Sequence, residues 1–201
     1  MTAVLDRRQL FARGARGGTY LLLAGGIAGV VPPLASADSI SDGDLAYARL
    51  LVGIEVLALD FLTQAIAARQ FGPGATAFMR RARFNEGEHY AAVAQILTGA
   101  GQVAATAADF DFSYPAKTFA SKGAIAKLGV ALETLSVGSY LGAVDALHTN
   151  TLKLPVARIA ASEAEHLGAF KALSDGDPVG NSFPDALTID AASNAFDLYA
   201  S

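Results

Sequence analysis

Apolar residues recur every three to four positions along four long stretches of the chain, which is the period of an amphipathic helix. These stretches cover about residues 44–70, 72–98, 121–148 and 155–174, and a shorter apolar stretch at 188–200 predicts a fifth helix. The fourth stretch opens with Pro155 near its first turn, a place where proline is tolerated. No segment alternates convincingly between apolar and polar residues at period two, so the pattern predicts an all-α domain.

The connections between these stretches predict how the helices pair. The first two are joined only by the residues around Gly72 and Pro73, so they should be antiparallel neighbours. Residues 101–120 have no helical period, and a connection of this length can run along a bundle and let the second and third helices lie parallel. We expect its aromatic side chains to attach it to the bundle surface (Phe110, Phe112 and Tyr114). The prediction is a four-helix bundle at 38–175, made of two antiparallel hairpins and a long crossover, with a C-terminal loop and short helix at 176–201 that pack on it.

The first 37 residues have the features of an export signal and are set aside from the fold. Arg7 and Arg8 form a twin arginine, a mild apolar run follows at 20–31, and Ala35-Ser36-Ala37 is an A-x-A cleavage site. This pattern predicts a twin-arginine export signal, with an ordinary secretory leader or an uncleaved N-terminal anchor as the alternatives. Either export route places the protein outside the cytoplasm, in the periplasm or cell wall or as a secreted protein.

Charge and cysteine content narrow the choice of partners. The leader carries four of the 15 basic residues and one of the 19 acidic ones, which leaves 11 basic and 18 acidic residues and a net charge of −7. Such a surface does not suit nucleic acid or an anionic membrane, so no stable membrane partner is expected unless the leader stays attached. Because the chain has no cysteine, any metal must be held by oxygen and imidazole.

Two segments place an acid and a histidine where core residues are expected. Residues 85–93 read NEGEHYAAV and residues 162–170 read SEAEHLGAF. Glu86 with His89, and Glu163 with His166, are three residues apart, so each pair projects from one side of its helix. Burying a carboxylate and an imidazole is costly unless something pairs with them.

Each of these segments is preceded by a helix with one glutamate in an apolar run. Glu55 lies 31 residues before Glu86, and Glu133 lies 30 residues before Glu163, so the two hairpins repeat one another. The chain has only six glutamates, and these four fill the repeated positions. The other two, Glu88 and Glu165, fall off the shared helix face and are interpreted as groups that face solvent or lie behind the site.

Two such hairpins bring four carboxylates and two imidazoles to one level of the core, which is the pattern of a dimetal carboxylate site. Four carboxylates offset the charge of two divalent cations. Oxygen and imidazole together suit iron, manganese or zinc better than calcium or magnesium. The alternative is a buried ion-pair network without metal, but no lysine or arginine lies within a turn of Glu55, Glu133 or Glu163 to neutralise them.

Over residues 44–174 the chain resembles the ferritin-like superfamily, and more narrowly the exported bacterial ferritin-like proteins related to the desiccation-associated proteins of plants. The resemblance implies a ferritin-like bundle with two metal ions, iron in the first place and manganese as the alternative. It also implies that Glu86 and Glu163 bridge the metals, that Glu55 and His89 complete one position, and that the remaining pair completes the other (Glu133 and His166). These six residues are the candidate metal ligands and the candidate catalytic residues.

Several functions fit such a site. The first is an oxidoreductase that oxidises ferrous iron or reacts with dioxygen or peroxide, with a dimanganese catalase-like activity as a variant. Iron binding or storage, in which the site is an entry port, is the second. The third is a stress-protective structural protein in which the metal holds the bundle together. A homo-oligomer is compatible with each of them.

Three other polar features of the sequence lie near these segments or at helix ends, and each has a structural interpretation besides a functional one. His148 is interpreted as a favourable charge at a helix C-terminus rather than as a ligand. Tyr140 lies seven residues after Glu133, hence on the same face, where it either hydrogen-bonds near the site or packs in the core. The arginines that precede Glu86, at positions 80, 81 and 83, are interpreted as a solvated face.

Overall fold

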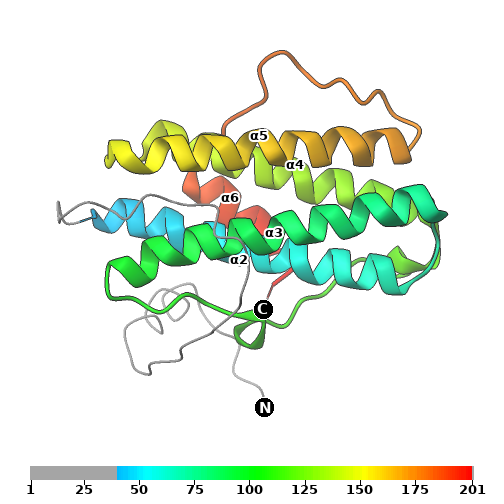
Figure 1. Cartoon of the computed structure of the whole chain (residues 1–201), viewed down its shortest axis with the longest axis horizontal. Helices are drawn as coiled ribbons and strands as arrows, with labels where there is room; N and C mark the ends of the chain where they lie inside the picture. The colour runs from blue at the N-terminus through cyan, green and yellow to red at the C-terminus, as the bar shows by residue number, and fades with distance from the viewer. Residues whose placement is uncertain (1–39, 201) are drawn as a thin grey trace.

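A computed structural model describes residues 40–200 of the chain. Within this part the fold consists of five α-helices, and the only strand-like pairing recorded there is an isolated antiparallel bridge between Phe112 and Ala200. The four long helices lie side by side along the long axis of the molecule, and the short fifth helix lies behind them (Figure 1). The predicted all-α bundle is confirmed. The predicted export signal at 1–37 lies outside the described residues.

The first hairpin consists of α2 (Asp42–Ala67) and α3 (Pro73–Gly99). Ser41 caps α2, because its Oγ accepts a hydrogen bond of 3.1 Å from the backbone N–H of Asp44. Proline at the first position of α3 fixes φ where the missing N–H costs nothing. α2 buries 16 of its 26 residues and α3 only six of its 27, so α2 is a central helix and α3 covers the outside of the bundle.

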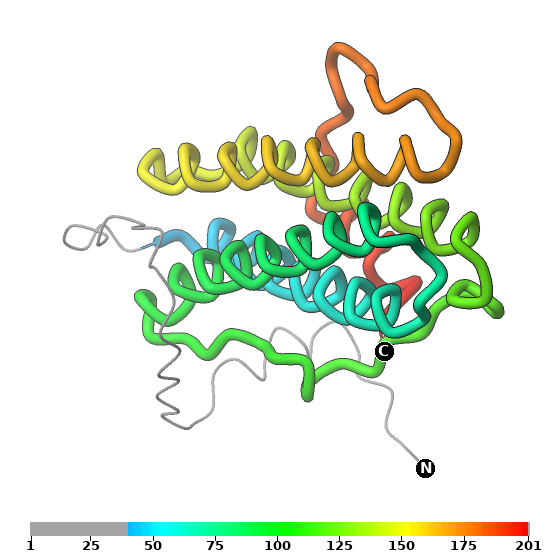
Figure 2. Tube along the Cα trace, turned by 45° about the vertical axis from the view of Figure 1, so that its right-hand side comes forward, coloured from blue at the N-terminus to red at the C-terminus, as the bar shows by residue number. Residues whose placement is uncertain are grey.

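The crossover between the hairpins contains two short 3₁₀ turns, η1 (Ala107–Asp109) and η2 (Thr118–Ala120). It runs along the bundle from the end of α3 to the start of α4 (Figure 2). Tyr114 attaches it, since its hydroxyl donates a hydrogen bond of 2.7 Å to Asp60 of α2. Phe110 and Phe112 stack on each other at 5.3 Å and both meet the ring of Phe196 edge-on. These aromatic contacts hold the crossover on the bundle as predicted.

The second hairpin consists of α4 (Lys122–Ala146) and α5 (Asn150–Leu173). The prediction that this last long helix opens at Pro155 is wrong, because α5 begins five residues earlier and Pro155 lies inside it. The first four N–H groups of a helix have no partner within it, so a proline in the second turn forfeits only one or two backbone bonds. Leu152 and Val156 are only 2% and 1% exposed, and their burial holds these first turns on the core.

The chain then leaves the bundle in a loop and returns as α6 (Ile189–Phe196). α6 contacts both α2 and α4. Two glycines allow close approach: a Cβ at Gly142 would lie 1.8 Å from the carbonyl oxygen of Leu187, and one at Gly53 would lie 3.0 Å from the ring of Phe196. Glycine in these two helices therefore makes room for the C-terminal segment.

α2 and α4 are also long and apolar enough to cross a membrane, by length and composition alone. In each of them, 67% of the most apolar window is buried inside the bundle. Their hydrophobicity is therefore explained by their central place in the core.

Asp44 ties the start of α2 to the connection between α4 and α5. Its side chain is 1% exposed, and its two oxygens accept hydrogen bonds of 2.9 Å from the backbone N–H groups of His148 and Thr149. Burial alone would raise the pKa of Asp44, but the hydrogen bonds from Thr149 and His148 outweigh it and hold the pKa below its ordinary value of 3.8. Ionised Asp44 therefore stabilises the folded protein.

Replacing Asp44 with alanine is expected to lower the free energy of unfolding at pH 7 by about 1–3 kcal/mol, because two backbone N–H groups lose a charged, buried acceptor. The folded-state pKa is lowered, so the stabilisation is fully present above the unfolded pKa and is lost as the pH falls through the folded pKa. The difference between wild type and Asp44→Ala should therefore shrink below about pH 4. Urea unfolding followed by circular dichroism over a pH series measures it. Asp42→Ala, at an exposed position in the same turn, is the control, and a difference that stays constant down to pH 2 would contradict the assignment.

Candidate metal centre

Each of the four long helices brings one glutamate to the same region of the core. None of the four is more than 3% exposed: Glu55 on α2, Glu86 on α3, Glu133 on α4 and Glu163 on α5. One turn after Glu86 and Glu163 come the two histidines, whose side chains are 11% exposed at His89 and 5% exposed at His166. The structure therefore brings together all six residues that the repeated motif predicts.

The ligand atoms of these residues form two groups, and within each group they lie within 4.8 Å of one another. The first group consists of Glu55, Glu86, His89 and Glu163, and the second of Glu86, Glu133, Glu163 and His166. Glu86 and Glu163 belong to both groups. Two groups that could each hold a metal ion thus share two carboxylates.

The two imidazoles sit in matching environments and turn Nδ1 inwards. His89 Nδ1 lies 2.9 Å from Glu163, 3.1 Å from Glu86 and 3.8 Å from Glu55. His166 Nδ1 lies 2.9 Å from Glu86, 3.3 Å from Glu163 and 4.0 Å from the other outer glutamate, Glu133. Each histidine therefore contacts both shared glutamates and approaches the glutamate of its own group.

Burial and charge shift the pKa values of these groups in opposite directions. Burial lowers the pKa of both histidines, but the negative carboxylates of Glu163 and Glu86 beside each ring outweigh it and raise the pKa to about 9 at His89 and about 10 at His166. Burial raises the pKa of Glu86, but the imidazoles of His166 and His89 beside it lower the pKa to about 2.

The two outer glutamates behave differently from Glu86. Burial, followed by the charges of the shared glutamates, raises the pKa of Glu55 and of Glu133 well above the ordinary value. Before any metal binds, protons therefore balance part of the charge of the cluster. A metal ion that binds here has to displace them, so its affinity falls as the pH is lowered.

Buried carboxylate oxygens without a hydrogen-bond partner show whether the cluster fits a cation. One buried oxygen of each of the four glutamates has no hydrogen-bond partner. Two of these oxygens, Glu86 Oε1 and Glu163 Oε1, lie 2.9 Å from an imidazole nitrogen but without the alignment of a hydrogen bond. An unsatisfied buried polar atom costs about 1–3 kcal/mol, and more if it is charged. Four such oxygens facing one region are what bound cations would satisfy.

The alternative of a metal-free ion-pair network leaves part of the cluster unsatisfied. All ion pairs recorded there for the four glutamates are made with His89 or His166, and none with lysine or arginine. These pairs still leave one buried oxygen on each of the four glutamates without a hydrogen-bond partner. The cluster could therefore hold metal ions, and its oxygen and imidazole donors suit iron or manganese.

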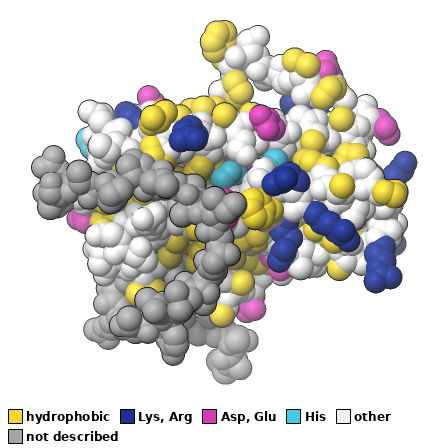
Figure 3. All heavy atoms as spheres, in the orientation of Figure 1, with side chains coloured by type: hydrophobic (Ala, Val, Ile, Leu, Met, Phe, Trp, Pro, Cys, Tyr) yellow, Lys and Arg dark blue, Asp and Glu magenta, His cyan; other side chains and the backbone are white. Residues whose placement is uncertain are grey.

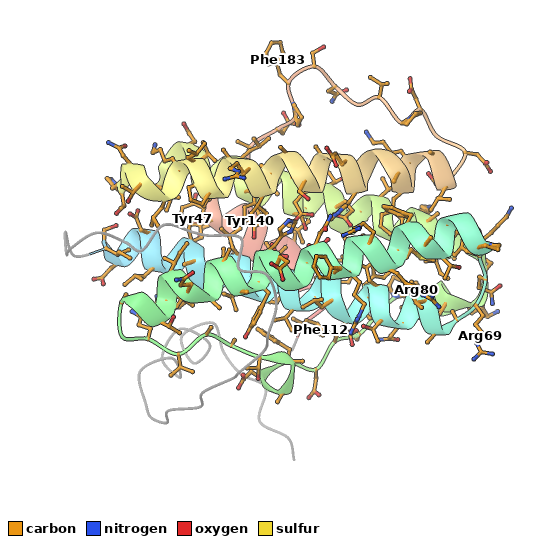
Figure 4. The ribbon with its side chains drawn as sticks, viewed as in Figure 1. Tyr47, Arg69, Arg80, Phe112, Tyr140 and Phe183 are labelled. Carbon is orange, nitrogen blue, oxygen red and sulfur yellow. The ribbon has the colours of Figure 1, made fainter. Side chains whose placement is uncertain are left out.

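The remaining candidate residues lie away from the cluster. Glu88 and Glu165 are exposed, as their place on the helix predicts. The side chain of His148 is 83% exposed and lies 3.6 Å from Asp44 near the end of the bundle, so it is not part of this group. Arg80 is exposed, and Figure 4 shows it on α3.

Two further side chains contact the cluster. Tyr140 of α4 is fully buried, and its hydroxyl donates a hydrogen bond to Glu55 Oε1, which settles the choice between a polar and a packing role in favour of the polar one. Asn85 Nδ2 lies 3.2 Å from His166 Nε2. The sequence reasoning missed Asn85. Its signal was its place directly before Glu86, on the flank of α3 that carries His89.

The cluster lies close to the surface on one side. Figure 3 shows histidine side chains at the surface between α3 and α5, with lysine or arginine side chains beside them. The 11% exposure of the His89 side chain agrees with this view. His89 is therefore the residue of the cluster that is most exposed at this face.

Comparison with known proteins gives one family. A family model described as a ferritin-like domain matches residues 43–175. The match covers the four long helices, apart from the first residue of α2, and all six residues of the cluster. No curated protein matches the chain.

Proposed function

The chain belongs to the ferritin-like domain family, and from this premise we propose that it is an exported protein whose carboxylate-bridged pair of metal ions oxidises ferrous iron with dioxygen or peroxide. The observation that carries the proposal is the pair of four-residue groups that share Glu86 and Glu163. A single structural cation would need only one such group. Two overlapping groups provide for two cations side by side.

The residues divide between the two positions as follows. Glu86 and Glu163 would contribute to both positions. Glu55 and His89 would complete the first position, and Glu133 with His166 the second. Four carboxylates offset the charge of two divalent ions, which removes most of the cost of burying either set alone.

When bound, two redox-active metal ions would each give one electron to an oxygen substrate, two electrons in total. The protein's own part is to hold the donor atoms in place, to exclude bulk water and to leave an approach for substrate. The buried apolar residues of α2 and α4 keep water from the inner side of the cluster. The exposed edge of His89, between α3 and α5, is the side on which substrates would enter.

Export is supported by the leader pattern at 1–37. The twin-arginine route carries proteins that are already folded, often with their cofactor in place. A protein with an interior metal centre would suit that route.

The test of the proposed reaction is a ferrous-oxidation assay on the purified full chain after loading with iron. Transfer of two electrons from two ferrous ions to one dioxygen, with two protons, gives two ferric ions and one hydrogen peroxide. Oxidation should exceed that of Glu163→Ala by about an order of magnitude or more, because this glutamate would serve both metal positions. Stopped-flow absorbance of ferric iron and an oxygen electrode measure it.

The same preparations are assayed for loss of added peroxide. Rapid peroxide loss only after loading with manganese would replace the proposed reaction with a catalase-like one. If the site is loaded and neither reaction exceeds that of Glu163→Ala, the enzymatic proposal is wrong, and a storage or structural role for the metal remains.

A further inference from the structure

The two hairpins repeat one another in register, so each position near the cluster has a counterpart in the other half. Glu55 corresponds to Glu133, and the segment NEGEH at 85–89 corresponds to SEAEH at 162–166. All six candidate ligands obey this repeat. Two of the groups behind them do not.

The first departure is at Tyr140. It lies seven residues after Glu133, and the residue seven positions after Glu55 is Leu62. Both are fully buried, at 0% exposure. Tyr140 donates its hydroxyl hydrogen to Glu55 Oε1. Figure 4 shows this side chain within the bundle. Leucine has no hydrogen to donate, so Glu133 cannot receive the equivalent bond.

The second departure is at Asn85. Its counterpart one residue before Glu163 is Ser162. Asn85 reaches across from α3 to the outer nitrogen of His166 on α5, at 3.2 Å. Among the described residues no hydrogen bond is recorded from Ser162 to His89, whose side chain is also the more exposed of the two imidazoles, at 11% against 5%.

The two departures act on opposite halves of the cluster. Tyr140 supports the carboxylate of the group that contains Glu55 and His89. Asn85 supports the imidazole of the group that contains Glu133 and His166. Each half thus has one outer ligand held by the protein and one outer ligand that is not.

We infer that Tyr140 and Asn85 are positioning residues that make the two metal positions chemically different. This inference rests on the proposed metal pair. Because Oε1 of Glu55 accepts from Tyr140, the carboxylate is oriented with Oε2, one of the four oxygens without a partner, as its free donor for a metal. Glu133 has no such constraint and keeps both oxygens for its metal.

Asn85 acts on the imidazole. When Nδ1 of a histidine binds a metal, the hydrogen of the ring is on Nε2 and needs an acceptor, which fixes the orientation of the ring. The amide of Asn85 can turn its oxygen to Nε2 of His166 and provide that acceptor. Removal of such a supporting group typically lowers metal affinity by about 10–100-fold.

The test is a titration of the chelator-treated full chain with cobalt(II), followed by calorimetry and by visible absorption, which reports the coordination of each ion. Wild type should bind two ions in two resolved steps with different spectra. Tyr140→Phe should weaken one step by about 10–100-fold and change its spectrum, and Asn85→Leu should do the same to the other step. Both substitutions keep the size of the side chain.

Matched variants separate positioning from a general loss of structure. Asn85→Asp retains an oxygen acceptor and should restore the affinity that Asn85→Leu loses, whereas Ser162→Ala, at the register-equivalent position, should leave both steps unchanged. Two indistinguishable cobalt-binding steps in the wild type, or the same step weakened by both variants, would overturn the inequivalence of the two positions. Neither result would contradict the metal pair itself. Failure of the wild type to take up two cobalt ions would instead refute the metal pair, and the inference with it.

Discussion

Replacing Glu163 with alanine is expected to remove both metal ions from the protein rather than one. Glu163 belongs to both four-residue groups, and its Oε1 and Oε2 lie 2.9 Å and 3.3 Å from the two histidines of those groups. Its loss leaves each position with three ligands and with uncompensated charge on its neighbours. Metal content after loading and desalting, measured by mass spectrometry per mole of chain, checks the prediction.

Glu165→Ala is the matched control for this change. It lies on the same helix two residues away, but its side chain is exposed, so two ions per chain should remain. Circular dichroism shows whether each variant keeps its helices. One ion retained in Glu163→Ala would mean that this carboxylate is not shared, and equal loss in both variants would mean that the assignment of helix faces is wrong.

Replacing Glu133 with methionine is expected to stabilise the protein when metal is absent and to destabilise it relative to wild type when metal is present. Glu133 is 3% exposed, and burial raises its pKa together with the charges of Glu86 and Glu163. An apolar side chain of similar length removes that desolvation cost, so the free energy of unfolding in chelator should rise by about 1–3 kcal/mol. Urea unfolding with and without added metal measures both effects.

The metal-dependent half of this prediction has its own magnitude. A ligand present at 100 times its dissociation constant adds about 2.7 kcal/mol to the stability of the state that binds it. Wild type should gain about this much per ion, and Glu133→Met should gain less because one position loses a ligand. Glu165→Met serves as the surface control and should change the free energy of unfolding by less than about 0.5 kcal/mol. A lower stability of Glu133→Met in chelator would contradict the account of buried charge.

The six residues of the cluster were predictable from the sequence because the same pattern of one Glu and one Glu-x-x-His occurs in both hairpins. Glutamate and histidine are scarce, and they recur at matched spacing in two apolar hairpins, so chemistry and periodicity point to the same positions. The bundle was predictable for a similar reason, since a short connection forces antiparallel neighbours and a long one permits a parallel crossover. In the structure the six residues form two overlapping groups, divided as the family resemblance implies.

The supporting residues were less accessible to sequence reasoning. Asn85 and Tyr140 act on ligands carried by other helices, 81 and 85 residues away in the chain, and no helical period encodes such a contact. Pro155 gave the wrong predicted start for α5, because proline is favoured at the start of a helix but is tolerated one turn later when the flanking residues are buried. In both cases tertiary packing decided what local preference left open.

Electron paramagnetic resonance of the chain loaded with manganese(II) tests the central claim most directly, because it reports both the number of ions and whether they lie next to each other. Two ions joined by the shared carboxylates of Glu86 and Glu163 should show the spectrum of an exchange-coupled pair, at a measured stoichiometry of two manganese ions per chain. A six-line spectrum of isolated manganese(II), or a stoichiometry of one ion per chain, would contradict a carboxylate-bridged metal pair in this bundle.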